Sequence, residues 1–134
     1  MRLRMHRGRK DRSGAAALEL ALLLPVLTYM AAVSTDYPRL FYALATLSDS
    51  ARAGALYYAT HPTASASTIQ QVAQADAGDL SPLPTVESTS GTDASGNAYV
   101  QVTVSWTFQT LTVNPGIPSS TVLSRTVVMM VNPS

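Results

Sequence analysis

The distribution of hydrophobic and polar residues divides the chain near residue 34. Residues 1–13 are polar and basic, whereas residues 15–34 form an apolar run whose one charged residue is Glu19. A helix rises about 1.5 Å per residue, so about 20 residues span about 30 Å, the thickness of a bilayer's hydrocarbon core. The pattern therefore predicts a membrane-spanning helix over residues 15–34, preceded by a basic leader over residues 1–14.

Beyond residue 34 the hydrophobic pattern keeps a helical period. Six small or apolar residues recur at intervals of four and three, which places them on one helical face. This seam consists of Leu40, Leu44, Leu47, Ala51, Gly54 and Tyr58. It predicts that a helix over residues 35–61 continues outside the membrane and ends near His61-Pro62. Two interpretations stay open: the seam packs against other protein subunits, or it covers the protein's own sheet.

Two prolines interrupt this helical stretch. Pro25 lies within the apolar run, and Pro38 follows it. Proline removes one backbone hydrogen bond from a helix interior but fits the first helical turn. We therefore expect a bend near residues 35–38, where Pro38 opens a second helix capped by Thr35 or Asp36.

The C-terminal part predicts a small α+β head over residues 62–134. Ser67-Thr68-Ile69-Gln70 matches a capping box, and Gly78 matches a C-terminal stop. A short helix is therefore expected over residues 68–77, with Ile69, Val72 and Ala73 on its inner face.

After this helix the hydrophobic period changes to two. Apolar and polar residues alternate from Val100 to Phe108, which indicates a half-buried strand with Trp106 packed on its apolar face. Residues 85–89 and 122–131 predict two further strands, and residues 90–97 a turn. The expected fold class is α+β, in which a long N-terminal membrane-spanning helix leads into a small antiparallel sheet of about three strands packed on helices.

Charge is concentrated at the N-terminus. Six of the nine basic residues lie in the first twelve positions, and from Ala15 onward three bases face seven acids. The basic character belongs to a leader, which argues against nucleic-acid binding. The positive-inside rule predicts a cytoplasmic N-terminus and a C-terminal head outside the bacterial inner membrane. Beyond the run, Asp36 and Arg39 are expected to form an exposed ion pair worth about 0.2–1 kcal/mol.

Reactive side chains do not converge in the sequence. The absence of cysteine excludes disulfides and thiolate metal sites, and His6 and His61 have no partners at metal-binding or triad spacing. Residues 93–97 resemble a calcium-binding turn but supply one carboxylate, so an ordinary turn is expected. We predict no catalytic residue, no metal, no cofactor and no small-molecule substrate.

The position of Glu19 bears on how the N-terminus is processed. An acidic residue at a bilayer centre costs about 2.5–3.5 kcal/mol, so an ordinary signal sequence has no reason to carry one. The chain could be cut after the apolar run, stay uncut as a signal anchor, or be cut between Gly14 and Ala15. The last cut leaves an amine on Ala15 that Glu19, four residues later on the helix, can neutralise. Glu19 thus favours the third outcome, unless its carboxylate merely reaches the membrane interface or the membrane span begins only at Leu20.

Three segments resemble the TadE-like family, the minor pilins or pseudopilins of the tight-adherence (Flp-type) pilus. They are residues 12–25, which include Gly14-Ala15-Ala16-Ala17-Leu18-Glu19, then Asp36-Tyr37-Pro38-Arg39-Leu40-Phe41-Tyr42, and Ala51-Arg52-Ala53-Gly54-Ala55. Pro38 stands where the family usually has glycine, and Ala53 where it has an acid. The resemblance is strong over residues 12–59 and diffuse beyond them.

This resemblance implies a precursor that a prepilin peptidase cuts after Gly14, with Gly14 and Ala15 presenting the scissile bond and Glu19 supporting recognition or subunit registry. It implies other pilin subunits, the pilus assembly machinery and the inner membrane as partners, the seam as a subunit contact, and a role in surface attachment. Two alternatives remain. One is a type II secretion pseudopilin, which more often has Phe at the first mature position. The other is an uncut, signal-anchored envelope protein with an external partner-binding domain.

Overall fold

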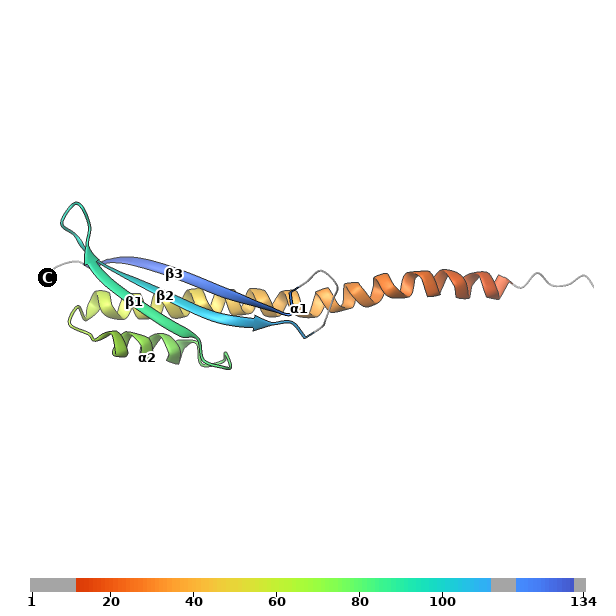
Figure 1. The fold of residues 1–134 in the computed structure, drawn as a ribbon, viewed down its shortest axis with the longest axis horizontal. Helices are drawn as coiled ribbons and strands as arrows, with labels where there is room; N and C mark the ends of the chain where they lie inside the picture. Colours follow the sequence, from red (N-terminus) through yellow and green to blue (C-terminus); the bar gives the residue numbers. More distant parts are fainter. Residues whose placement is uncertain (1–11, 112–117, 132–134) are drawn as a thin grey trace, which may run out of the picture. The chain divides into compact units, whose positions relative to one another are not determined.

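The computed structural model describes residues 12–111 and 118–131. These residues form two helices and a three-stranded antiparallel sheet, which confirms the predicted α+β class (Figure 1). The elements are α1 (Arg12–Thr60), α2 (Ala66–Asp76), β1 (Thr85–Thr92), β2 (Ala98–Gln109) and β3 (Ser120–Val131). The chain separates into two compact units, Met1–Ser34 and Thr35–Ser134. Most of the predicted leader, residues 1–11, lies outside the described residues.

The first unit contains the apolar part of α1. Its large apolar side chains between Leu18 and Met30 are 48–70% exposed. The best 18-residue window of the helix has a mean hydropathy of 1.9, so by length and composition the helix can cross a membrane. Thr28 fits this apolar stretch because its hydroxyl donates a 2.8 Å hydrogen bond to the Leu24 carbonyl.

α1 is helical on both sides of Pro25 and Pro38 and ends at Thr60, as expected near His61. The expectation that Pro38 opens a second helix is therefore wrong. A proline in a helix interior deprives the carbonyl four residues earlier of its hydrogen bond, and for Pro38 that carbonyl belongs to Ser34. The turns that follow Pro38 pack against the sheet through Ala43 and Leu47. The bend expected near residues 35–38 stays a prediction, because the boundary between the two units falls there.

The sheet has the strand order β1-β2-β3, and both pairings are antiparallel. On the central strand Val100, Val102 and Val104 have no exposed surface, which confirms the alternation predicted from the sequence. Directly paired residues of antiparallel strands point to the same face. Arg125 of the edge strand β3 pairs with the buried Val104, so its position is on the face of the sheet that carries the core. Arg125 itself is nevertheless exposed.

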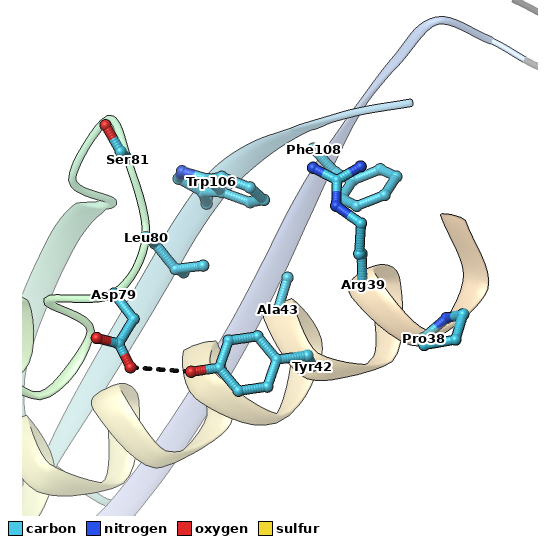
Figure 2. A pocket seen from close by; sticks show the side chains of 9 residues that line it. All are labelled: Pro38, Arg39, Tyr42, Ala43, Asp79, Leu80, Ser81, Trp106 and Phe108. Atoms are coloured by element: carbon cyan, nitrogen blue, oxygen red, sulfur yellow. Dashed lines mark hydrogen bonds between the residues drawn. The ribbon is translucent and has the colours of Figure 1, made fainter. Parts of the chain in front are cut away.

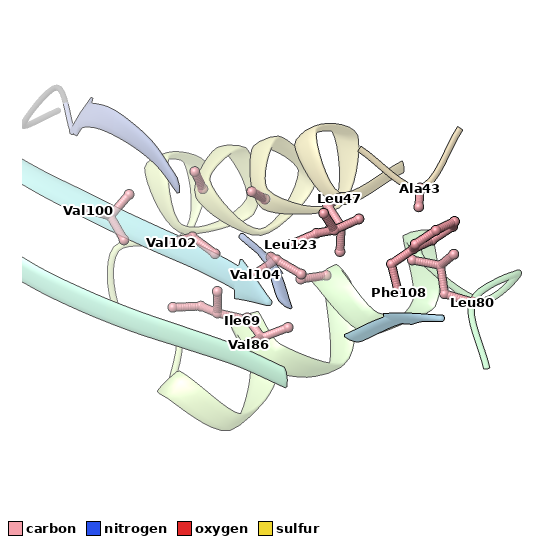
Figure 3. Close-up of a cluster of buried hydrophobic side chains, with 13 residues drawn as sticks. Ala43, Leu47, Ile69, Leu80, Val86, Val100, Val102, Val104, Phe108 and Leu123 are labelled. Carbon is pink, nitrogen blue, oxygen red and sulfur yellow. The ribbon is translucent and has the colours of Figure 1, made fainter. Parts of the chain in front are cut away.

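One face of the sheet packs against α1 and α2, as the sequence predicted, and Figure 3 shows the side chains that meet there. The core combines small residues of the helices with larger residues of the strands. Its buried members are Ala43, Leu47, Ala51, Ala55, Ile69, Ala73, Leu80, Val86, Val100, Val102, Val104, Phe108 and Leu123. Because the helices contribute mainly alanine, their backbones lie close to the sheet.

α2 begins earlier than predicted. Ser65, rather than Ser67, is the N-cap residue, and its hydroxyl accepts a 3.3 Å hydrogen bond from the Thr68 backbone N–H. The predicted inner face is confirmed: Ile69 and Ala73 are buried, and Val72 is half-buried. The helix ends at Asp76, immediately before the Ala77 cap and Gly78.

The β1–β2 hairpin has a shorter turn than predicted, because β1 continues to Thr92. Within the turn the Asp93 carboxylate accepts 2.8 Å hydrogen bonds from the backbone N–H groups of Ser95 and Asn97. The bond from Asn97 is the main reason that the pKa of Asp93 is lowered. Gly96 has φ of +87°, a conformation that side chains rarely tolerate. Asp93 therefore serves to close a turn.

Candidate functional site

The predicted cleavage residues lie at the beginning of α1. Gly14, Ala15 and Glu19 are all helical and exposed. Ala15 and Glu19 are separated by four residues, so they lie on one helical face. A Cβ added at Gly14 would meet no described atom within 4 Å. Packing within the described structure therefore gives no reason for a glycine at this position.

The seam packs against the protein's own core. Leu47 and Ala51 have no exposed surface, and Gly54 is buried. Leu40, Leu44 and Tyr58 are half-buried against the same core. Of the two interpretations left open by the sequence, the structure supports the seam as cover for the protein's own sheet. A contact between these residues and other subunits stays a prediction.

Gly54 lies where α1 packs closely against α2 and β2. A Cβ at this position would be 3.3 Å from Ala73 Cβ and from Ile69 Cγ2, and 3.4 Å from Val102 Cγ1. These distances are shorter than the optimum of about 3.5–4.0 Å between carbon atoms. The absence of a side chain at Gly54 thus permits the close approach of three elements.

Ser50 also joins the two helices, a role that the sequence pattern did not predict. Its side chain is fully buried, and its hydroxyl donates a 2.6 Å hydrogen bond to the Ala73 carbonyl. Ala73 belongs to α2, 23 residues further along the chain. The available signal was a small polar residue next to Ala51 on the core-facing side of a helix. The sequence does not reveal the partner of Ser50, because that partner is a backbone carbonyl, a group that every residue carries.

Asp36 and Arg39 form the predicted ion pair at 3.3 Å, but Asp36 is not exposed as expected. Asp36 is 9% exposed, and its Oδ1 atom accepts a 3.0 Å hydrogen bond from the Leu111 backbone N–H. The Arg39 guanidinium lies over the Phe108 ring, 5.4 Å from its centroid. The first helical turn of the second unit is therefore fastened to the end of β2 by charge-assisted contacts.

A pocket of about 490 Å³ lies beside these contacts (Figure 2). Its lining residues come from α1, from the segment after α2 and from β2. They are Pro38, Arg39, Tyr42, Ala43, Asp79, Leu80, Ser81, Trp106 and Phe108. The Tyr42 hydroxyl donates a 2.9 Å hydrogen bond to Asp79 Oδ2, and this bond is the main reason that the pKa of Tyr42 is raised. Tyr42 therefore stays a protonated donor at neutral pH.

Trp106 lies at the edge of the core. It is half-buried beside Phe108, with ring centroids 6.3 Å apart, and its indole N–H donates a 2.7 Å hydrogen bond to the Pro82 carbonyl. The predicted core packing is thus only partial, because one side of the ring lines the pocket.

The described residues contain no group of three or more histidine, cysteine or acidic residues placed to hold a metal ion. His61 stacks on Tyr57 at the end of α1, with ring centroids 4.5 Å apart. Its ring nitrogen Nδ1 lies 3.2 Å from the Tyr57 carbonyl. In the described structure this histidine has a capping role.

A comparison with known families finds a similarity in the N-terminal part of the chain. The model of the TadE-like protein family matches residues 14–56. The match begins at Gly14 and extends through most of α1, including all of the seam except Tyr58. No curated protein and no solved structure is significantly similar to the chain. The match supports a protein associated with the tight-adherence pilus.

Proposed function

We propose that this protein, whose residues 14–56 are TadE-like, is the precursor of a minor pilin (pseudopilin) of the tight-adherence pilus. The observation that carries the proposal is a family match that begins at Gly14 and follows α1 out of the apolar run. In this role the protein is anchored by one apolar helix and acts in pilus assembly for surface attachment. Its partners are a prepilin peptidase, other pilin subunits and the assembly machinery.

The peptidase acts on the peptide bond between Gly14 and Ala15. Nothing in the described packing requires glycine at position 14, which supports a role in peptidase recognition. After hydrolysis Ala15 becomes the new N-terminus, and Glu19 lies one turn away from its amine. A carboxylate near a helix N-terminus is favourable by about 0.3–1 kcal/mol. Glu19 can equally neutralise the amine of a neighbouring subunit.

The membrane arrangement follows from the charge pattern. The basic residues before Gly14 hold the N-terminus in the cytoplasm, so the head lies outside the inner membrane. Hydrolysis at Gly14 removes these residues and leaves the apolar helix as the beginning of the mature subunit. That step makes the subunit competent for transfer into a filament.

Contacts with other pilins are expected first on the exposed side of α1. In the second unit Tyr37, Phe41 and Leu56 are 53, 63 and 54% exposed, whereas the seam is buried or half-buried. Tyr37 and Phe41 also contact each other, with ring centroids 6.3 Å apart. These exposed side chains can be covered without disturbing the core. A seam contact with another subunit would require the head to open.

The cleavage step can be tested by co-expressing the full chain with a cognate prepilin peptidase in bacterial membranes. Intact mass of the purified protein should show a species that begins at Ala15. Gly14→Val should abolish this species, whereas the matched change Gly8→Val in the leader should leave it intact. A protein that still begins at Met1 would establish an uncut anchor. A protein that begins after Ala32 would establish a secreted domain.

The pilus role itself requires a second measurement in the native host. Deletion of the gene should reduce pili and surface attachment, and Gly14→Val should reproduce that loss while Gly8→Val should not. Loss of extracellular enzyme secretion with normal pili would instead identify a type II secretion pseudopilin.

A further inference from the structure

The pocket beside Arg39 and Asp79 lies close along the chain to the end of the apolar run. Its first lining residue, Pro38, is four residues beyond Ser34, the last residue of the first unit. Residues 34–38 are helical, and a helix rises about 1.5 Å per residue, so Pro38 lies about 6 Å beyond Ser34 along α1. The polar layers of a bilayer extend about 5–8 Å beyond each side of the hydrocarbon core. If α1 spans the membrane as proposed, the pocket is within reach of lipid headgroups.

The pocket carries one cation and one carboxylate on opposite sides (Figure 2). The Arg39 side chain is 42% exposed, and only its Nη1 atom is hydrogen-bonded to other described residues. Asp79 accepts the Tyr42 hydroxyl through Oδ2, while its Oδ1 atom bonds to no other described residue. Arg39 thus keeps donors for an anion, and Asp79 keeps an acceptor for a cation.

The surface between these two charges is apolar. Leu80, Trp106 and Phe108 line it, and the pocket volume of about 490 Å³ lies in the usual range for small-ligand sites. A ligand that matches this arrangement has an anion and a cation joined by a short carbon linker. The opposite charges of the pocket disfavour a purely anionic group, since Asp79 would repel it.

We propose that this pocket binds the zwitterionic headgroup of a membrane phospholipid of the phosphatidylethanolamine type. The phosphate lies toward Arg39, the ammonium group lies toward Asp79, and the connecting carbons lie on the apolar surface. This inference rests on the proposed membrane anchoring, but not on cleavage at Gly14. Bound in this way, a lipid attaches the head to the membrane surface before the subunit leaves the bilayer.

Trp106 provides the test because it is the only tryptophan in the chain and lines the pocket. The full chain is reconstituted into nanodiscs of phosphatidylglycerol, into which phosphatidylethanolamine is added at constant total lipid. Quenching of Trp106 fluorescence by acrylamide is then measured. We expect a saturable fall of about twofold in the quenching constant, because a bound headgroup covers the side of the Trp106 ring that lines the pocket.

Two carboxylate variants separate pocket binding from general charge effects. Asp79→Asn removes the charge that faces the ammonium group but keeps an oxygen acceptor for Tyr42, and it should abolish the protection by phosphatidylethanolamine. Glu87→Gln removes an equal charge from an exposed position on β1 and should behave like the unmodified protein.

Three results would overturn the proposal. The first is quenching of the unmodified protein that does not change with phosphatidylethanolamine content. The second is equal protection in Asp79→Asn. The third is protection that depends on the number of protein copies per disc rather than on lipid, which would identify a second subunit as the occupant. Failure of the chain to enter nanodiscs would refute the anchoring itself, a result distinct from all three.

Discussion

A size series at Gly54 tests whether the seam is committed to the protein's own core. A Cβ at this position would approach carbon atoms of Ala73, Ile69 and Val102 to 3.3, 3.3 and 3.4 Å. Two of these neighbours are on α2 and one is on β2, so a single methyl group would have to separate three packed elements. Packed interiors resist such separation because few voids are available to absorb it.

The expected free energies follow from two opposing effects. Replacing a helical glycine by alanine gains about 1 kcal/mol in helix propensity. Overpacking a core costs about 1–3 kcal/mol, so Gly54→Ala should destabilise the head by about 0–2 kcal/mol. Gly54→Val gains only about 0.4 kcal/mol in propensity and adds two further methyl groups. Its expected cost of about 2–3 kcal/mol lowers the Tm of a head of this size by about 10–20 °C.

The assay is unfolding of the full chain in detergent micelles, followed by the fluorescence of Trp106. Ala45→Val is the matched control, because Ala45 is exposed on the same helix and should lose only about 0.6 kcal/mol of helix propensity. A Gly54→Val protein that unfolds no earlier than this control would refute the core role of Gly54. Weakened association between subunits in that variant, with an unchanged Tm, would show that Gly54 faces a neighbouring subunit instead.

Three further predictions concern polar contacts in the head. Asp36→Ala should reduce the free energy of unfolding in urea by about 2–3 kcal/mol, because it removes a charged acceptor from the Leu111 N–H. Asp36→Asn keeps an oxygen acceptor and should cost less than half as much. Equal losses in the two variants would contradict this. Ser50→Ala should cost about 1 kcal/mol or less in the same assay, because the Ala73 carbonyl keeps a 3.2 Å hydrogen bond from the Ala77 N–H; a loss above about 3 kcal/mol would contradict it. The lowered pKa of Asp93 means that its stabilising contribution is complete above the ordinary value of 3.8 and is lost as pH falls through the lower folded value. Melting curves of Asp93→Ala and the unmodified protein should therefore differ at pH 6 and converge in strong acid; a constant difference would contradict this.

The parts of the fold that the sequence predicted are those with a strict local period. The alternation from Val100 to Phe108 identified the central strand because one of its faces is covered and the other is not. The period of the seam likewise identified the buried face of α1. Both patterns indicate which face of an element is buried, and they do so without showing which other element covers that face.

The parts that the sequence did not predict depend on contacts between distant segments. β1 continues to Thr92 because β2 supplies its pairing partners, and Gly91 leaves room for the Tyr99 ring, whose hydroxyl would lie 3.0 Å from an added Cβ. Ser65 and Ser67 are both suitable caps. Asp36 accepts a hydrogen bond from the Leu111 backbone N–H, 75 residues away in the chain. No local sequence pattern reveals such a contact.

The same limit applies to the candidate site. Gly14, Ala15 and Glu19 could be named from the sequence because a peptidase reads a short linear segment. The pocket could not, because its lining combines α1 with Asp79 and Trp106 from separate parts of the chain. Sequence patterns therefore led to the proposed linear cleavage site and missed the pocket, which exists only after folding.

Arg125 on the edge strand has a consequence for how subunits can join. An exposed strand edge offers unpaired backbone groups to any other strand, and a charged residue in the core-facing register is a known protection against such pairing. A second sheet that added to β3 would have to place its own apolar face beside this guanidinium. If the protein assembles as proposed, crowded subunits would thus be kept from merging into a continuous sheet, and ordered growth of a filament would be left to the helices.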